Sequence, residues 1–99
     1  MTGTFEELIN SQEPVLIDFT TEWCKPCKVV SAVLNKLVNE MEEDITVVKI
    51  DMDKNPALRK KYKIEAIPTL IIFKRGQQKW RHTGLISLPE IKKAMVGSF

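Results

Sequence analysis

The sequence predicts an α/β domain in which a four-stranded mixed sheet is flanked by helices on both faces. Two apolar, β-branched runs, 15–20 and 45–50, lie on either side of an amphipathic stretch at 25–43. A strand–helix–strand unit of this kind places its two strands in parallel, with a right-handed crossover. Two further runs, 69–74 and 78–83, flank a short turn and predict an antiparallel hairpin.

The first half of the chain contains sequence signals for the start of two helices and a strand. Thr4 and Glu7 have capping-box spacing, which predicts a short helix over about 4–10. Pro14 then precedes the first strand. The long helix at 25–43 is predicted by apolar residues at helical spacing, which would turn one face to a core. These residues are Val30, Val33, Leu34, Leu37, Val38 and Met41.

The second half of the chain also contains start signals for two helices. Asn55 can cap a third helix that starts at Pro56 and runs to about 62. The segment 75–77 supplies the turn of the hairpin. Ser87 and Glu90 again have capping-box spacing, so a last helix is expected to run to about 96.

Composition and charge exclude several classes of function. Fifteen basic and 13 acidic residues leave a net charge of +2, so neither nucleic acid nor a membrane is expected as a partner. No apolar run approaches the roughly 20 residues that a membrane span needs. The first residues lack the basic start and apolar core of a signal peptide, and two close cysteines do not make a disulfide framework. We therefore expect one domain over residues 1–99, monomeric and cytoplasmic.

The only two cysteines, Cys24 and Cys27, lie where the first strand gives way to the long helix. Residues three apart near a helix start share one face, with Cβ atoms about 5–6 Å apart, so a small adjustment allows a disulfide. Pro26 falls in the first turn, where its missing N–H has no helical partner to lose, and it stiffens the loop. The spacing predicts two thiols that can close and open a disulfide.

The helix start also predicts which thiol reacts first. Free N–H groups and the helix dipole favour an anion there, so Cys24, the more N-terminal and more exposed thiol, should attack as a thiolate with a lowered pKa. Cys27, one turn further, should be shielded and should resolve the mixed disulfide. Two other uses of the pair stay open: a structural disulfide, or half of a zinc site to which His82, otherwise a surface strand residue, could add a ligand.

Asp18 interrupts the apolar run of the first strand, six residues before Cys24. A strand of a parallel sheet is usually covered on both faces, so the carboxyl is expected to be buried and its pKa raised. It could then accept the proton of Cys27 as a general base, directly or through water. Lys49, in the neighbouring strand, could pair with it. The alternative is a carboxylate that reaches solvent at the end of the strand.

Several motifs together resemble the thioredoxin family, from about residue 4 to the end and in the family's order and spacing. The resemblance implies a thioredoxin fold. The motifs are the active-site segment at 18–28, the next strand and helix start at 49–51 and 55–56, the cis-proline strand and turn at 66–70 and 73–76, and the glycine after the last strand at Gly84.

The resemblance implies a role for individual residues. Cys24 would be the nucleophile, Cys27 the resolving thiol, Asp18 the buried proton acceptor and Lys49 the residue that tunes it. The Ile67–Pro68 peptide bond would be cis, which leaves the Ile67 backbone free to hydrogen-bond an extended substrate segment. The residues expected around the reactive sulfur are Trp23, Lys25, Pro26, Ile67, Pro68 and Gly84; for Trp23 the alternative is packing in the core.

The resemblance also implies an activity, the reduction of disulfides in client proteins. An NADPH-linked flavoprotein, thioredoxin reductase, would recharge the dithiol, and no bound cofactor is expected because the cysteine pair is the redox group. A more oxidising thiol oxidant or isomerase is one alternative, which Lys25 and Pro26 disfavour because strongly oxidising relatives usually carry histidine beside the second cysteine. The other is a binding module without turnover, which the two cysteines and Asp18 disfavour.

Three departures from the family's pattern carry consequences. Lys25 stands where the family usually has glycine, and its charge should stabilise the Cys24 thiolate. Thr20 replaces the usual tryptophan, which makes one wall beneath the site smaller and more polar. The chain before the first strand is too short for the extra N-terminal strand of longer members, so the sheet should have four strands and one more exposed edge.

Overall fold

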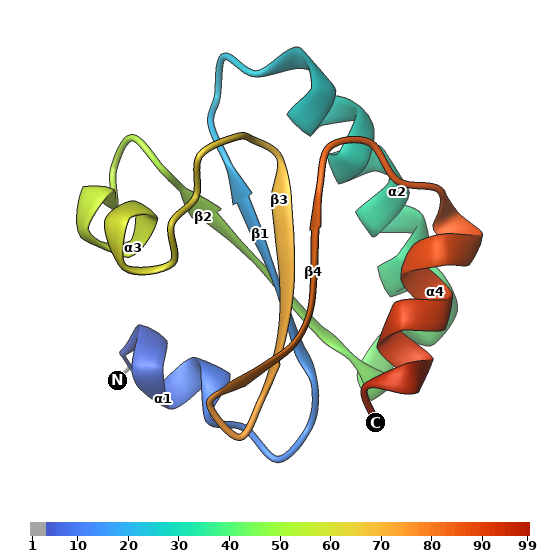
Figure 1. Cartoon of the computed structure of the whole chain (residues 1–99). Coiled ribbons are helices and arrows are strands. Elements are labelled where there is room, and N and C mark those ends of the chain that lie inside the picture. The colour runs from blue at the N-terminus through green and yellow to red at the C-terminus, as the bar shows by residue number, and fades with distance from the viewer. Residues whose placement is uncertain (1–3) are drawn as a thin grey trace.

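Four strands form one mixed sheet in the order β2-β1-β3-β4 in the computed structural model, which describes residues 4–99 (Figure 1). Strands β1 and β2 are parallel, whereas β3 is antiparallel to both β1 and β4. The expected four-stranded mixed sheet is therefore confirmed. The elements are α1 (Phe5–Ile9), β1 (Val15–Thr20), α2 (Lys25–Met41), the 3-10 turn η1 (Glu42–Asp44), β2 (Thr46–Asp51), α3 (Pro56–Lys61), β3 (Thr69–Lys74), β4 (Gln77–Thr83) and α4 (Leu88–Gly97).

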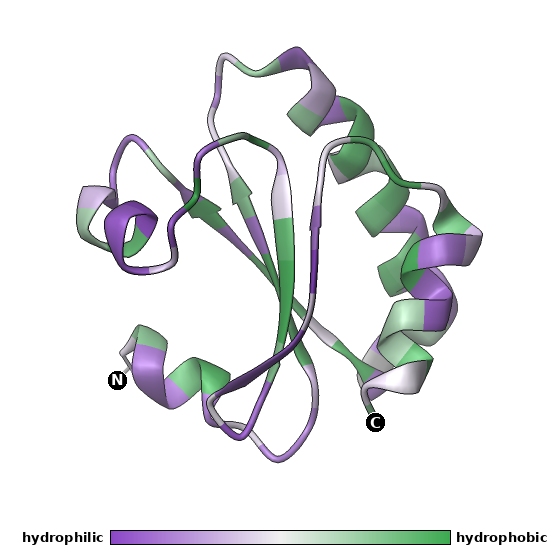
Figure 2. Cartoon of the chain, in the orientation of Figure 1, coloured by the Kyte–Doolittle hydropathy of each residue, from purple (hydrophilic) through white to green (hydrophobic). Residues whose placement is uncertain are grey.

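Helices cover both faces of the sheet, with α2 and α4 on one side and α1 and α3 on the other (Figure 1). Each side has its own core, because successive strand residues point to opposite faces. Leu16 packs with Leu34 and Leu37 of α2, whereas Ile17 and Phe19 pack on the side of α1 and α3. Figure 2 shows the consequence along the sheet: β3, near the centre, is largely hydrophobic, and the edge strand β4 is mostly hydrophilic.

The same alternation decides where Asp18 lies. Asp18 is two residues from Leu16 and therefore shares its face, the one that α2 covers. Lys49 of β2 is its register partner in the parallel pair, and Leu70 is its partner on β3. The acidic group thus lies on the face of the sheet beneath α2.

Two of the three helix caps predicted from the sequence are confirmed, since Thr4 and Ser87 accept hydrogen bonds from the N–H groups of Glu7 and Glu90. Helix α2 is capped by Cys24, which was not predicted as a cap. Asn55 occupies the N-cap position of α3, but the prediction that its side chain caps the helix was wrong. Its side-chain amide instead donates to the Asp51 carbonyl oxygen at 2.9 Å and fastens the loop after β2.

Two boundaries differ from the expected ones for local reasons. Helix α2 ends at Met41 rather than at 43, because Glu42 takes a positive φ of 48° that stops the helix. Strand β4 begins at Gln77, one residue early, because Arg75 and Gly76, with φ of 54° and 80°, complete the turn by themselves. No helix among residues 4–99 is long and apolar enough to cross a membrane.

Candidate active site

The two cysteines are joined in a disulfide at the start of α2, with their Cα atoms 5.3 Å apart. Cys24 is the N-cap residue, and its sulfur accepts the N–H of Cys27 at 3.2 Å. A side-chain acceptor at this position satisfies one of the free N–H groups of the first turn. Pro26 lies in that turn, as the sequence predicted. The same N–H would stabilise a thiolate on Cys24 after reduction.

The sulfur of Cys24 is less exposed than the sequence suggested. Cys24 is 4% exposed and Cys27 2%, so Cys24 is the more exposed of the two, as expected, but both are buried in the disulfide form. The cause is the loop before β3, since the Cys24 sulfur lies 4.0 Å from the Ile67 carbonyl oxygen. Access to Cys24 is therefore decided by this loop and by the exposed Lys25 and Pro26.

The loop before β3 is fixed by hydrogen bonds on both sides. The Ile67–Pro68 peptide bond is cis, which confirms the prediction from the resemblance. The Gly84 N–H donates to the Pro68 carbonyl oxygen at 2.9 Å, and Gly84 has a φ of +97°, which glycine adopts at little cost. The Thr69 hydroxyl donates to the Ala66 carbonyl oxygen at 2.6 Å. These bonds hold Ile67 next to Cys24.

Trp23 lies on the surface and is 69% exposed, so the alternative of core packing was wrong. Its indole N–H donates to a carboxylate oxygen of Asp53 at 2.8 Å. Asp53 was missed by the sequence reasoning, although Asp51 and Asp53 directly after a strand were a visible signal for a side-chain turn. Asp51 accepts the N–H of Asp53 at 2.8 Å, so the two carboxylates together set the position of the indole.

Asp18 is fully buried, as expected, and the alternative of a solvent-reaching carboxylate was wrong. Neither of its carboxylate oxygens has a hydrogen-bond partner among the described residues. Burial raises the pKa of Asp18 from 3.8 to about 6, and the positive charge of Lys49 offsets part of this effect. A carboxyl group with this pKa changes protonation close to neutral pH.

Lys49 does not make the direct pair with Asp18 that the sequence suggested. Its ammonium group donates instead to the Ser31 hydroxyl on α2, and the Asp18 oxygens stay without a partner. The strand register brings Lys49 beside Asp18, but the ammonium group of Lys49 is bonded to the helix. Ser31 is a second residue that the sequence reasoning missed, since only the packing of α2 on the sheet brings it to Lys49.

A cleft of about 350 Å³ opens beside the second cysteine. Thr20 is one of its walls, which agrees with the smaller and more polar wall that replacing tryptophan predicted. The cleft connects solvent with Cys27 and the Ser31–Lys49 pair. Its lining residues are Thr20, Thr21, Glu22, Cys27, Lys28, Ser31, Lys49, Asp51 and Lys54.

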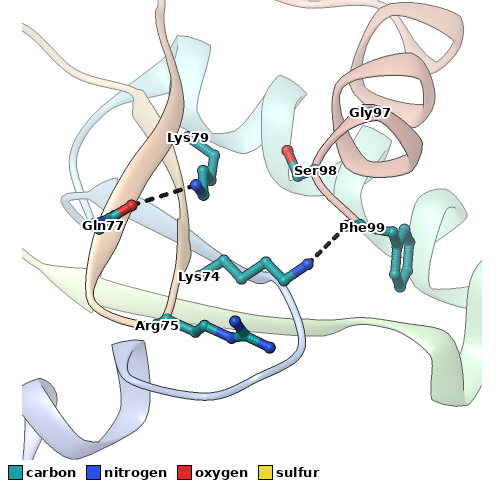
Figure 3. A pocket seen from close by; sticks show the side chains of 7 residues that line it. All are labelled: Lys74, Arg75, Gln77, Lys79, Gly97, Ser98 and Phe99. Carbon is teal, nitrogen blue, oxygen red and sulfur yellow. Dashed lines mark hydrogen bonds between the residues drawn. The ribbon is translucent and has the colours of Figure 1, made fainter.

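A different pocket, of about 410 Å³, lies between the β3–β4 turn and the C-terminal end of α4 (Figure 3). Three cationic side chains line it, Lys74, Arg75 and Lys79, and Lys74 donates to the Phe99 carbonyl oxygen at 2.6 Å. It contains no thiol. The redox chemistry therefore belongs to the end of the sheet where α2 begins.

The described part of the chain contains no cluster of ligands for the zinc site that was considered as an alternative. No group of three or more His, Cys, Asp or Glu side chains is arranged to hold a metal ion among residues 4–99. His82 lies on β4, where its ring stacks on Trp80 and its Nε2 lies 2.8 Å from the Leu85 carbonyl oxygen. Cys24 and Cys27 are bonded to each other.

Comparison with known proteins agrees with the cysteine geometry. The thioredoxin family model matches residues 1–96. The chain belongs to the thioredoxin family. A thioredoxin of Rickettsia bellii is 40% identical over 80 residues, which are 81% of this chain and 76% of that protein. A bifunctional thioredoxin reductase/thioredoxin of Mycobacterium leprae is 40% identical over 80 residues, or 18% of its length.

Solved structures place the fold in the same family. Oxidised mitochondrial thioredoxin 3 from Saccharomyces cerevisiae superposes with a TM-score of 0.83 at 31% identity, over 94% of this chain and 86% of that one. The fold is therefore the thioredoxin fold, with four strands among the described residues. As a thioredoxin, the protein is a disulfide reductase that works by dithiol–disulfide exchange.

Proposed function

We propose that Cys24 and Cys27 reduce disulfides in client proteins, with Cys24 as the nucleophile and Cys27 as the resolving thiol. The observation that carries this assignment is the position of Cys24 as N-cap of α2, where its sulfur accepts the Cys27 N–H. A helix start stabilises a thiolate at that place. Cys27 lies within the helix and already bonds to Cys24 in the oxidised form.

The reaction proceeds in two exchanges. The Cys24 thiolate attacks one sulfur of the client disulfide, forms a mixed disulfide and releases the other client sulfur as a thiolate. Cys27 then loses its proton and attacks the Cys24 sulfur, which releases the second client thiolate. Two electrons have moved from the cysteine pair to the client, and the pair ends as the disulfide seen here.

Asp18 takes the proton of Cys27 in the second exchange. Its burial beneath α2 and its raised pKa support this role, because a general base works best with a pKa near the operating pH. Lys49 tunes Asp18 through its charge rather than through a hydrogen bond. The cleft beside Cys27 offers the route by which the proton exchanges with water.

The client is held around Cys24 by a mixed apolar and backbone surface. The Ile67 backbone is adjacent to the sulfur and suits strand-like pairing with an extended client segment. The exposed ring of Trp23 would pack against the client. The other residues proposed for this surface are Lys25, Pro26, Pro68 and Gly84.

A thioredoxin reductase is the proposed source of electrons, since a relative carries a reductase and a thioredoxin in one chain. We propose an NADPH-linked flavoprotein for this step. The cysteine pair itself needs no further group. We also propose that the chain acts as one monomeric domain in the cytoplasm.

The direct test is reduction of insulin by dithiothreitol, followed as turbidity. The wild type should accelerate the reaction, and Cys24→Ser should return it to the uncatalysed rate. An Asn35→Ala variant, which changes an exposed residue of α2, serves as the control and should keep full activity. Equal rates for the wild type and Cys24→Ser would remove the proposal.

A further inference from the structure

Ser31 occupies a special place on α2. It lies four residues after Cys27, so both side chains are on the same face of the helix. That face covers the side of the sheet that carries Asp18. Ser31 is half-buried and lines the cleft beside Cys27. Its hydroxyl accepts a hydrogen bond from the Lys49 ammonium group. The hydroxyl therefore connects the helix of the cysteines to the strand next to Asp18.

This contact separates two groups that would otherwise attract each other. Asp18 and Lys49 are register partners on parallel strands and share one face of the sheet. An ammonium group and a buried carboxylate at that spacing would normally form an ion pair, which favours the ionised carboxylate. Here the Lys49 ammonium group donates its hydrogen bond to the Ser31 hydroxyl. Both Asp18 oxygens lack a hydrogen-bond partner among residues 4–99.

No other charged group near the cleft, among the described residues, takes the place of Lys49 as a partner of Asp18. Lys54 is paired with Glu22 at 3.6 Å. Asp51 accepts the backbone N–H groups of Asp53 and Lys54. On β3, the residue opposite Asp18 is the apolar Leu70. The titratable groups at this end of the face are Cys27 and Lys28 on α2, Lys49 and Asp51 on β2, and Glu22 and Lys54 in the loops.

We propose that Ser31 is a positioning residue for proton transfer at Asp18, because its hydroxyl holds the Lys49 ammonium away from the carboxylate. Without a counter-ion, Asp18 stays basic enough to accept the Cys27 proton and release it to the cleft. This inference rests on the proposed role of Asp18 as proton acceptor. According to this inference, Ser31 on α2 controls how strongly the charge of Lys49 acts on the Asp18 carboxyl.

The test is a pH titration of the Asp18 carboxyl carbon by NMR in the oxidised protein, where neither cysteine titrates. In Ser31→Ala the ammonium is free to move to Asp18, so the titration midpoint should fall by about 1 pH unit, as an opposite charge at contact lowers a carboxyl pKa. An unchanged or higher midpoint in Ser31→Ala would overturn the proposal. Alanine favours the helix, so the variant should fold.

Two further variants separate positioning from a general effect on structure. Ser31→Thr keeps the hydroxyl and should keep the wild-type midpoint. In a Lys49→Gln background, Ser31→Ala should leave the midpoint unchanged, because the serine acts only through the lysine. The same shift with and without Lys49, or with threonine at position 31, would contradict the positioning role.

The titration is independent of whether the protein reduces clients. If Cys24→Ser leaves insulin reduction unchanged, the proposed function fails, and the Asp18 midpoint still reports on Ser31. If the midpoint does not move in Ser31→Ala while Cys24→Ser is inactive, only the role of Ser31 fails. Asn35→Ala, another change to alanine on α2, should leave the midpoint where it is in the wild type.

Discussion

At the scale of single residues, Asp18 connects stability with chemistry. A buried carboxylate without a hydrogen-bond partner is unfavourable, and the protein avoids part of this cost by keeping the group protonated up to a pH of about 6. Because the pKa is higher in the folded state than in the unfolded state, the folded protein binds more protons between pH 4 and pH 6. Stability should therefore fall as the pH rises through this window.

Asp18→Asn tests this directly. The change removes the charge at nearly constant volume, so it should raise the free energy of unfolding at pH 7 by about 3 kcal/mol, because burial raises the pKa of Asp18 from 3.8 to about 6. At pH 4 the two proteins should differ by less than about 1 kcal/mol, since the wild-type carboxyl is then neutral in the folded state. Urea unfolding at both pH values measures the difference. Equal gains at pH 4 and pH 7 would mean that the charge is not the cause.

Lys25 is the second residue with a consequence for the chemistry. It is exposed at the first position of α2, next to Cys24, where a positive charge stabilises a thiolate and therefore the reduced form. Lys25→Gly should make the reduction potential more negative by about 5 to 20 mV, which corresponds to about 0.3–1 kcal/mol. Equilibration in dithiothreitol buffers measures the potential. Lys36→Gln, further along α2, should leave it unchanged, and an equal shift there would argue against a local effect.

At the scale of elements, α2 holds the active site in place through its buried face. Leu37 is fully buried against the sheet, whereas its neighbour Val38 is 39% exposed. The start of this helix carries the cysteine pair, so the packing of α2 on the sheet determines where the cysteine pair is held. Stability and site geometry therefore depend on the same contacts.

Leu37→Ala should lower the free energy of unfolding by about 2–5 kcal/mol, because it leaves a cavity in the core beneath α2. Val38→Ala, one residue away, should cost less than about 1 kcal/mol. Guanidinium unfolding of both variants measures the two values. Similar losses for the two variants would contradict the burial of this face.

The sequence predicted the elements well and their side-chain contacts less well. The helical spacing around Leu34 and the β-branched strands are local signals, so the order and type of the elements could be predicted. The burial of Asp18 followed from its place in an apolar strand. The contact between Lys49 and Ser31 could not be predicted, because it depends on how a helix packs over a neighbouring strand and on the direction of one long side chain.

At the scale of the whole molecule, the reactive groups gather at one end of the sheet. Cys24, Ile67 and the cleft beside Cys27 lie where β1 ends and α2 begins. The basic pocket with Lys74 and Arg75 lies at the opposite end of β3, where the chain turns into β4 (Figure 3). The edge strands are β2 and β4, and Ile67 lies in the loop just before the central strand β3. Because this residue is outside the strand ladders, pairing of a client with the Ile67 backbone would leave the strand pairs of the sheet unchanged.

The most direct measurement of the central claim is the trapping of a mixed disulfide. A disulfide-containing peptide is mixed with reduced Cys27→Ser and with reduced Cys24→Ser, and covalent adducts are counted by mass spectrometry. Cys27→Ser should accumulate an adduct on Cys24, because attack proceeds and resolution cannot, whereas Cys24→Ser should form little. Equal adducts in both variants, or an adduct only on Cys27, would contradict the assignment of nucleophile and resolving thiol.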